Sequence, residues 1–142
     1  MEKTKKSWKF FSWSTLGVVL VSCVLNAIIW VGFHGFPLVG IPEKEEVESV
    51  TIFYGEEKER NIAESEDIDL LVKACNLLNY QLWGEKKGDP ELTVVYHLKN
   101  GEDVKVEANG TTVWWRGKAY AIKEKDTFVN ILQGLFFDRE RQ

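Results

Sequence analysis

The chain offers few residues that could perform chemistry, since it has two histidines and two cysteines in 142 residues. His97 and Asp103 face each other across a predicted hairpin, and such a pair can act in a hydrolase as a general base and its orienting acid. A hydrolase would also need a nucleophile or a metal ion. No serine lies near His97 in the predicted sheet, and no zinc-like ligand spacing occurs. We therefore expect a cross-strand charge pair and predict no catalytic residue, metal site or cofactor, with a hydrolase that uses His97 and Asp103 as the alternative.

Three further patterns lack the spacing that their chemistry would require. Cys75 falls on the apolar side of a predicted helix, where nothing nearby in sequence would activate the thiol, so we interpret it as a core residue. The acidic clusters at 43–48, 56–59 and 64–69 lack the alternating aspartates and the glycine of a calcium loop. The lysines of 84–88 lack the flanking strand and helix of a phosphate loop. We expect the charged residues of these segments to be solvated.

Trp114 is the candidate binding residue. The predicted strand alternation places it on the polar face of the sheet, near Val95, Ala119 and Ala121. A large exposed indole is a plausible contact residue in an interface. Cover by the first strand, by the loop at Trp83 or by the C-terminal tail is the structural alternative.

The position of these residues depends on an apolar stretch, Leu16–Phe36, which is long enough for one helix across a bilayer. No charged residue occurs between Lys9 and Glu43. Four lysines precede the stretch and an acid-rich segment follows it, so the lysine bias places the N-terminus in the cytoplasm. The lipid bilayer is thus a predicted partner through Leu16 to Phe36. We expect a single-pass protein of the cell membrane with a cytoplasmic basic tail (1–13), a transmembrane helix (14–36), a spacer (37–46) and an extracytoplasmic domain (47–142).

The anchor also contains a sequence similar to a lipoprotein signal, Leu20-Val21-Ser22-Cys23. Lipidation of Cys23 would remove the preceding segment. A mature lipoprotein normally becomes polar soon after its cysteine, whereas Val24–Phe36 stays apolar. The stretch spans a bilayer only if it is kept whole, which favours an uncleaved anchor over a lipidated Cys23.

Composition limits the partners and the number of domains that we expect for the part of the chain after the anchor. Residues 43–142 hold 14 Lys and Arg against 21 Asp and Glu, a net charge of −7, so we expect no nucleic acid as a partner. A length of about 100 residues suits a single domain with one modest core. Cys23 lies in the anchor and Cys75 in the domain, so we predict no disulfide.

Hydrophobic periodicity predicts an α+β fold in the order β-α-β-β-β-β-α, with an antiparallel β-meander covered on one face by two helices. The first strand is 47–54, with a short return strand through Ile62 as an option. A helix capped by Ser65 should extend to about Tyr80, with Leu77 as a possible member of its buried face. A loop over 81–90 should be anchored by Trp83. The remaining elements are strands at Leu92–Leu98, Asp103–Ala108, Thr111–Arg116 and Lys118–Ile122, and a helix at Asp126–Arg139 whose predicted apolar side is Phe128, Ile131, Leu132, Leu135 and Phe136.

The register of the meander follows from keeping apolar residues on one face. A three-residue loop that ends at Gly101, in the left-handed conformation, pairs Tyr96 with Val104, Val94 with Val106 and Leu92 with Ala108. At the next connection a two-residue turn of Asn109 and Gly110 pairs Val113 with Val106 and Trp115 with Val104. A turn at Arg116 and Gly117 then brings Tyr120 and Ile122 to the same face.

The layout resembles small single-pass or lipoprotein-like envelope proteins of Gram-positive bacteria, whose extracytoplasmic domains have no assigned function. The resemblance rests on the lysine-rich tail, the anchor, the 36–42 spacer and the segments Glu48–Tyr54 and Lys99–Val106. It implies an envelope location and a non-enzymatic role, and it transfers no functional residue. The leading hypothesis is a membrane-tethered binding or accessory module with a membrane-protein or envelope partner. An envelope hydrolase using His97 and Asp103 and a purely structural tether are the alternatives.

Overall fold

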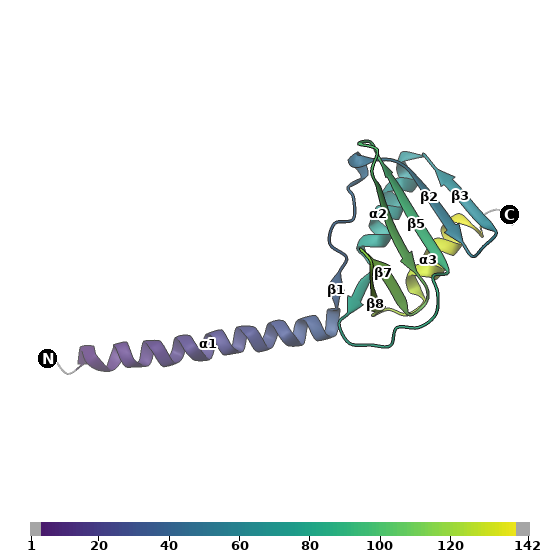
Figure 1. Ribbon diagram of the computed structural model, residues 1–142. Helices are drawn as coiled ribbons and strands as arrows, with labels where there is room; N and C mark the ends of the chain where they lie inside the picture. The colour runs from purple at the N-terminus through teal and green to yellow at the C-terminus, as the bar shows by residue number, and fades with distance from the viewer. Residues whose placement is uncertain (1–3, 139–142) are drawn as a thin grey trace. The chain divides into compact units, whose positions relative to one another are not determined.

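The computed structural model describes the backbone of residues 4–138 and the side chains of residues 13–138 (Figure 1). The chain divides into two units, and the boundary in the sequence lies between His34 and Gly35. The first unit contains helix α1 (Thr4–His34), in which Trp13–His34 is long and apolar enough to cross a membrane. The predicted anchor extended two residues too far, to Phe36. The helix ends earlier because Gly35 takes a left-handed conformation (φ +73°) and Phe36 begins a strand.

The second unit contains one antiparallel sheet of eight strands in the described residues, with order β1-β4-β8-β7-β6-β5-β2-β3. Helices α2 (Ser65–Asn76) and α3 (Thr127–Phe136) lie together behind the sheet in Figure 1. The predicted α+β class is therefore confirmed. The strands are β1 (Phe36–Pro37), β2 (Val47–Tyr54), β3 (Lys58–Ile62), β4 (Asn79–Gln81), β5 (Leu92–Leu98), β6 (Asp103–Ala108), β7 (Thr112–Trp115) and β8 (Lys118–Ile122), with a short 3-10 helix at Lys44–Glu46 before β2.

Alternation along the strands produces the core. On β2, Val50 and Ile52 are fully buried on the side of the helices. Phe53, the residue after Ile52, is exposed on the opposite face. β5 repeats this pattern, since Leu92, Val94 and Tyr96 are buried. We call the side that carries α2 and α3 the core face and the opposite side the outer face.

The predicted end of the first domain helix is wrong, because the chain forms two short strands that were not predicted. The chain uses Phe36–Pro37 and Asn79–Gln81 as strands, and β1 pairs with β4, which pairs in turn with β8. Helix α2 therefore ends at Asn76 and does not continue to Tyr80. Leu77, past its end, is exposed, and Glu64 occupies the N-cap position assigned to Ser65.

Helix α3 begins where it was predicted, although its cap differs. Asp126 is the N-cap residue, but its side chain makes no capping hydrogen bond, and its backbone N–H donates to the Gly110 carbonyl (2.8 Å). Phe128 and Leu132 are buried as expected, while Ile131 is partly exposed. The predicted end at Arg139 lies outside the described residues.

The first hairpin of the meander has the predicted register. Tyr96 pairs with Val104 and Val94 with Val106, and Gly101 has φ +86°. The apolar pattern and the loop therefore agree. The Arg116 and Gly117 turn is also confirmed, since Trp115 pairs with Lys118 and both turn residues have positive φ.

The second hairpin has a different register from the prediction, because Ala108 pairs with Val113 and Val106 with Trp115. Asn109 causes the shift. Its buried side chain accepts hydrogen bonds from the backbone N–H groups of Thr111 (2.9 Å) and Thr112 (2.8 Å), which stabilises a longer connection, with residues 109–112 between the paired Ala108 and Val113. A shift of two residues keeps every side chain on its predicted face, so the alternation could not reveal it.

Asn109 also holds the long loop that follows β4. Its amide nitrogen donates to the carbonyls of Lys87 (2.7 Å) and Asp89 (3.1 Å), while the Lys87 N–H donates to the Thr112 hydroxyl (3.0 Å). The loop thereby covers the outer face of β7 and β8 at Thr112. Trp83, the predicted anchor of this loop, is instead 77% exposed.

Candidate functional site

The outer face presents polar and aromatic side chains from β2, β5, β6 and β7 to solvent. Cross-strand pairs place Thr51 beside Val95, Val95 beside Lys105, and His97 beside Asp103. The next row contains Phe53, Thr93, Glu107, Trp114 and Ala119. The sequence predicted that His97 and Asp103 would meet here, and the structure confirms it.

A chain of hydrogen bonds crosses three strand boundaries on this face. His97 Nδ1 lies 2.8 Å from Asp103 Oδ1, and His97 Nε2 lies 2.9 Å from the Thr51 hydroxyl. The Thr51 hydroxyl in turn donates to Asn61 Oδ1 (3.0 Å). The imidazole is thus fixed on both sides by residues of neighbouring strands.

The hydrogen bonds connect Thr51, His97 and Asp103 in the order of a nucleophile, a base and an acid. Thr51 was not identified from the sequence as a member of this group. The signal was available in part, because alternation places Thr51 on the outer face, but the pairing of β2 with β5 was not predicted. Two features oppose a nucleophilic role. Thr51 is only 6% exposed, and its hydroxyl is already bonded to Asn61. A nucleophile must reach its substrate, so the geometry fits a structural hydrogen-bond chain better.

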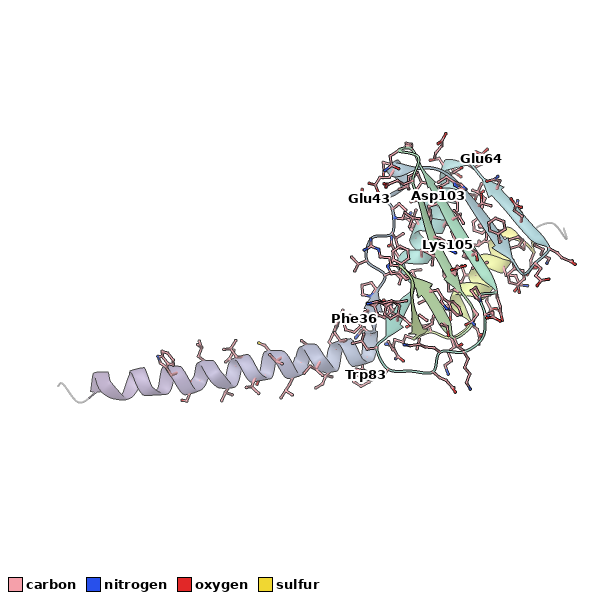
Figure 2. The ribbon with its side chains drawn as sticks, viewed as in Figure 1. Phe36, Glu43, Glu64, Trp83, Asp103 and Lys105 are labelled. Atoms are coloured by element: carbon pink, nitrogen blue, oxygen red, sulfur yellow. The ribbon has the colours of Figure 1, made fainter. Side chains whose placement is uncertain are left out.

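A hollow of about 510 Å³ opens where β6 extends beyond its neighbour. Only Val106–Ala108 of β6 pair with β7, so Asp103, Val104 and Lys105 have no partner on that side. Figure 2 shows Asp103 and Lys105 along this strand. The hollow is lined by Gly40, Asp103, Val104, Lys105, Glu107, Trp114, Trp115, Arg116 and Gly117.

Arg116 is exposed and lies at the rim of this hollow. Its guanidinium lies 5.4 Å from the Trp115 ring centroid, in a cation–π contact, and a side chain at Gly40 would collide with it. The Trp115 indole N–H donates to the Val39 carbonyl (3.3 Å), which holds this segment against the strand. The residues before β2 are therefore a wall of the hollow and not a simple spacer.

Trp114, the predicted binding residue, lines the hollow but is half-buried and not fully exposed. Its strand neighbours are Glu107 and Ala119. Lys105 contacts Glu107 through an ion pair (3.0 Å), so both charge signs border the ring. Aromatic residues are enriched in protein–protein contact sites, and charged residues such as Lys105 and Glu107 occur mainly at the polar rim of such sites.

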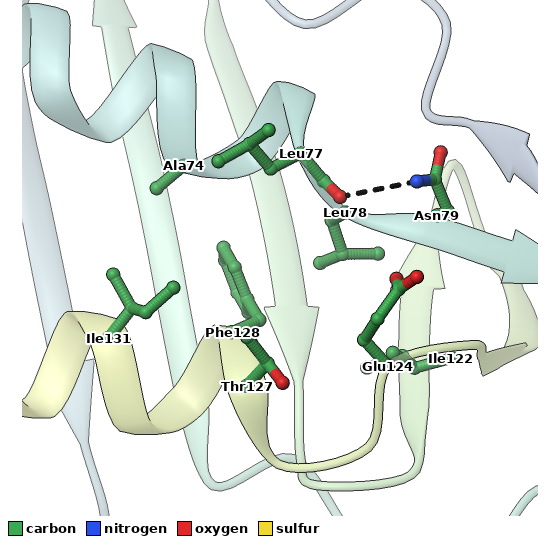
Figure 3. Close-up of a pocket in the computed structure, with 9 residues that line it drawn as sticks. All are labelled: Ala74, Leu77, Leu78, Asn79, Ile122, Glu124, Thr127, Phe128 and Ile131. Carbon is green, nitrogen blue, oxygen red and sulfur yellow. Dashed lines mark hydrogen bonds between the residues drawn. The ribbon is translucent and has the colours of Figure 1, made fainter.

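A second hollow, of about 300 Å³, lies on the helix side between the end of α2 and the start of α3 (Figure 3). Its walls are mainly apolar and include Leu77, Leu78, Phe128 and Ile131. Glu124 and Asn79 lie at this hollow, but nothing there forms a set of groups that would orient a reacting molecule.

Cys75 is a core residue, as predicted. It has no solvent exposure, and Tyr96 donates its hydroxyl proton toward Sγ (2.9 Å) and the Leu71 carbonyl (3.1 Å). Burial raises the pKa of the Cys75 thiol to about 12, against the opposing effect of the Tyr96 hydrogen bond. Burial, and then the neighbouring Cys75, raises the pKa of Tyr96 well above its usual value. The thiol is therefore protonated and inert at neutral pH.

Within the described residues, no three His, Cys, Asp or Glu side chains come together as a metal site. Comparison with known proteins adds no relative, because no family model, curated protein or solved structure matches the chain. The candidate site is therefore defined by the geometry of the outer face alone.

Proposed function

We propose that this chain is a membrane-tethered binding module that spans the cell membrane once through α1. The lysines before the apolar stretch support a cytoplasmic N-terminus, and the absence of charge across the stretch supports its retention in the bilayer. The domain that begins at Gly35 is then extracytoplasmic. Protease added to intact spheroplasts should digest this domain, whereas protection of the domain would contradict the orientation.

The observation that carries the binding role is the hollow at the unpaired half of β6. It combines Trp114 and Arg116, two of the residue types that contribute most to protein interfaces, with strand backbone that has no β7 partner. Such an open edge suits an extended segment of a polypeptide partner. The adjacent opposite charges of Lys105 and Glu107 favour a protein over a nucleic acid.

Photo-crosslinking in intact cells tests this role. A photoreactive amino acid in place of Lys105 should give a discrete adduct with one envelope or membrane protein. The same group in place of Glu59 is the matched control, because Glu59 is exposed on the outer face at the β3 edge. Equal adduct patterns from both positions would contradict a specific site, and adducts from neither would favour the purely structural tether.

The second candidate is an envelope hydrolase that uses His97 and Asp103. The observation in its favour is the distance of 2.9 Å between the Thr51 hydroxyl and His97 Nε2, with Asp103 on the other imidazole nitrogen. Thr51→Val removes the hydroxyl at nearly constant volume. If it abolished a cellular phenotype of the gene while the domain remained folded, the hydrolase would replace the binding module.

A further inference from the structure

An exposed apolar tip follows β4, in a domain that otherwise keeps its large apolar residues mainly in the core. Leu82 is 52% exposed and Trp83 is 77% exposed. Farther along the loop, Lys87 and Asp89 are held to the sheet through Asn109 and Thr112. Two consecutive apolar side chains held in water call for a covering surface.

The strand pairing places this tip at the end of the domain where the chain arrives from α1. Phe36 pairs with Tyr80 and Pro37 with Asn79, so β4 runs antiparallel to β1 and returns toward Gly35. Trp83 is three residues beyond Tyr80, and Figure 2 shows Phe36 and Trp83 at the same end of the domain. A side chain at Gly35 would lie 2.8 Å from the Tyr80 carbonyl, which shows how closely the two segments approach.

The covalent chain then limits what can cover the tip. Gly35 directly follows the last residue of α1, so if α1 spans a bilayer, the covalent chain keeps the β1–β4 pair within the reach of a few residues from the membrane surface. Tryptophan prefers the interface between hydrocarbon and water, because its ring is amphipathic. Lys86 follows three residues later, and a long lysine side chain can reach phosphate head groups, whereas Lys87 is ion-paired with Glu85 (2.5 Å).

We infer that the Leu82–Trp83 tip inserts into the interfacial region of the bilayer that α1 spans, and so forms a second membrane contact for the domain. This contact would hold the β1–β4 end against the lipid head groups. Lipid, and not a protein partner, is the occupant that the proximity to Gly35 favours. The inference rests on the proposed membrane anchor, but it is independent of the hollow at Trp114.

The test uses the full chain in vesicles of phosphatidylcholine and phosphatidylglycerol. p-Benzoylphenylalanine replaces one aromatic residue at a time: Phe33 in the apolar helix, Trp83 at the tip, or Phe53 on the outer face as the matched exposed control. After illumination, mass spectrometry should find lipid adducts at positions 33 and 83 and none at 53. Leu82→Gln should lower the adduct yield at position 83 and leave the yield at position 33 unchanged.

The outcomes separate the two proposals. A lipid adduct at position 33, with a yield at position 83 no greater than that at 53, would overturn the tip contact and leave the anchor intact. A lack of adduct at position 33 would overturn the anchor and the tip contact together. A protein adduct in place of a lipid adduct at position 83, in membranes from cells, would also overturn the tip contact.

Discussion

The core face and the outer face of the sheet are built from the same strands, yet apolar side chains fill one and polar side chains occupy much of the other. On the core face, Val50, Ile52 and Tyr96 are fully buried against α2 and α3. On the outer face, Thr51 and His97 share hydrogen bonds, and the hollow at Trp114 remains open. Most of the buried apolar side chains therefore lie on the core face, whereas the outer face carries the polar network and the hollow.

The largest expected contrast is between two neighbours on β2. Ile52→Ala should lower the free energy of unfolding by about 2 to 5 kcal/mol, because Ile52 is fully buried and the cavity cannot close completely. Phe53→Ala, on the outer face, should cost under about 1 kcal/mol. Chemical denaturation of the full chain in detergent, followed by near-UV circular dichroism, measures both. Equal losses would show that the outer face is also covered.

The next effect concerns two asparagines that each precede a glycine. Asn109→Ala should cost about 1 to 3 kcal/mol, because it leaves two carbonyls and two backbone N–H groups without their partner. Asn100→Ala is the control, since Asn100 is exposed and its hydrogen bonds remain within its own turn. The same denaturation experiment compares them. An equal effect at both sites would contradict the role of Asn109 in holding the loop.

These two asparagines also show how far the sequence determines the fold. The strands from β5 to β8, β2, the helix pair and the first hairpin were predictable, because alternation and the Gly101 loop agree on one register, whereas the short strands β1 and β4 were not. At Asn109 the local Asn-Gly pattern favoured a two-residue turn, but long-range hydrogen bonds to Lys87 and Asp89 stabilise a longer one. Sequence periodicity carries no information about such contacts.

The candidate site was predictable to the same limited extent. His97 and Asp103 belong to one hairpin, so their contact followed from its register. Thr51 reaches His97 only because β2 pairs with β5, a long-range choice that the pattern of either strand leaves open. The hollow exists because β7 pairs with only part of β6. The two-residue turn predicted at Asn109 would have paired the two strands over their full length, so the hollow was not predicted.

Alkaline pH should lower the free energy of unfolding through the buried thiol of Cys75. Burial raises the pKa of the Cys75 thiol to about 12 in the folded protein, whereas the thiol of the unfolded chain ionises near pH 9. The stabilisation from the buried, protonated thiol is therefore complete below about pH 9 and is lost as the pH rises toward 12. Between these values the free energy of unfolding should fall by about 1.4 kcal/mol per pH unit for this group. Cys75→Ala should fall less steeply between about pH 9 and 10. Parallel pH profiles of the two proteins would contradict this assignment.

The smallest expected effect is that of His97→Gln on the outer face. Exposed polar pairs contribute little, so loss of the hydrogen bond with Asp103 should change the free energy of unfolding by under about 1 kcal/mol. Denaturation of the full chain measures this change. A loss as large as that of Ile52→Ala would mean that the Thr51 and His97 chain supports the sheet itself.

The central claim is that the outer face binds a partner through the hollow and does not catalyse a reaction. The direct measurement is the yield of the protein adduct from the photoreactive residue at position 105, in cells, in two further backgrounds. Trp114→Ala should strongly lower the yield of the adduct, since loss of an aromatic contact residue commonly costs about 2 kcal/mol or more of binding, roughly a thirtyfold loss of affinity. His97→Gln should leave the adduct and the cellular phenotype nearly intact. Loss of the phenotype in a folded His97→Gln protein, with the adduct unchanged in Trp114→Ala, would contradict the binding module and favour the hydrolase.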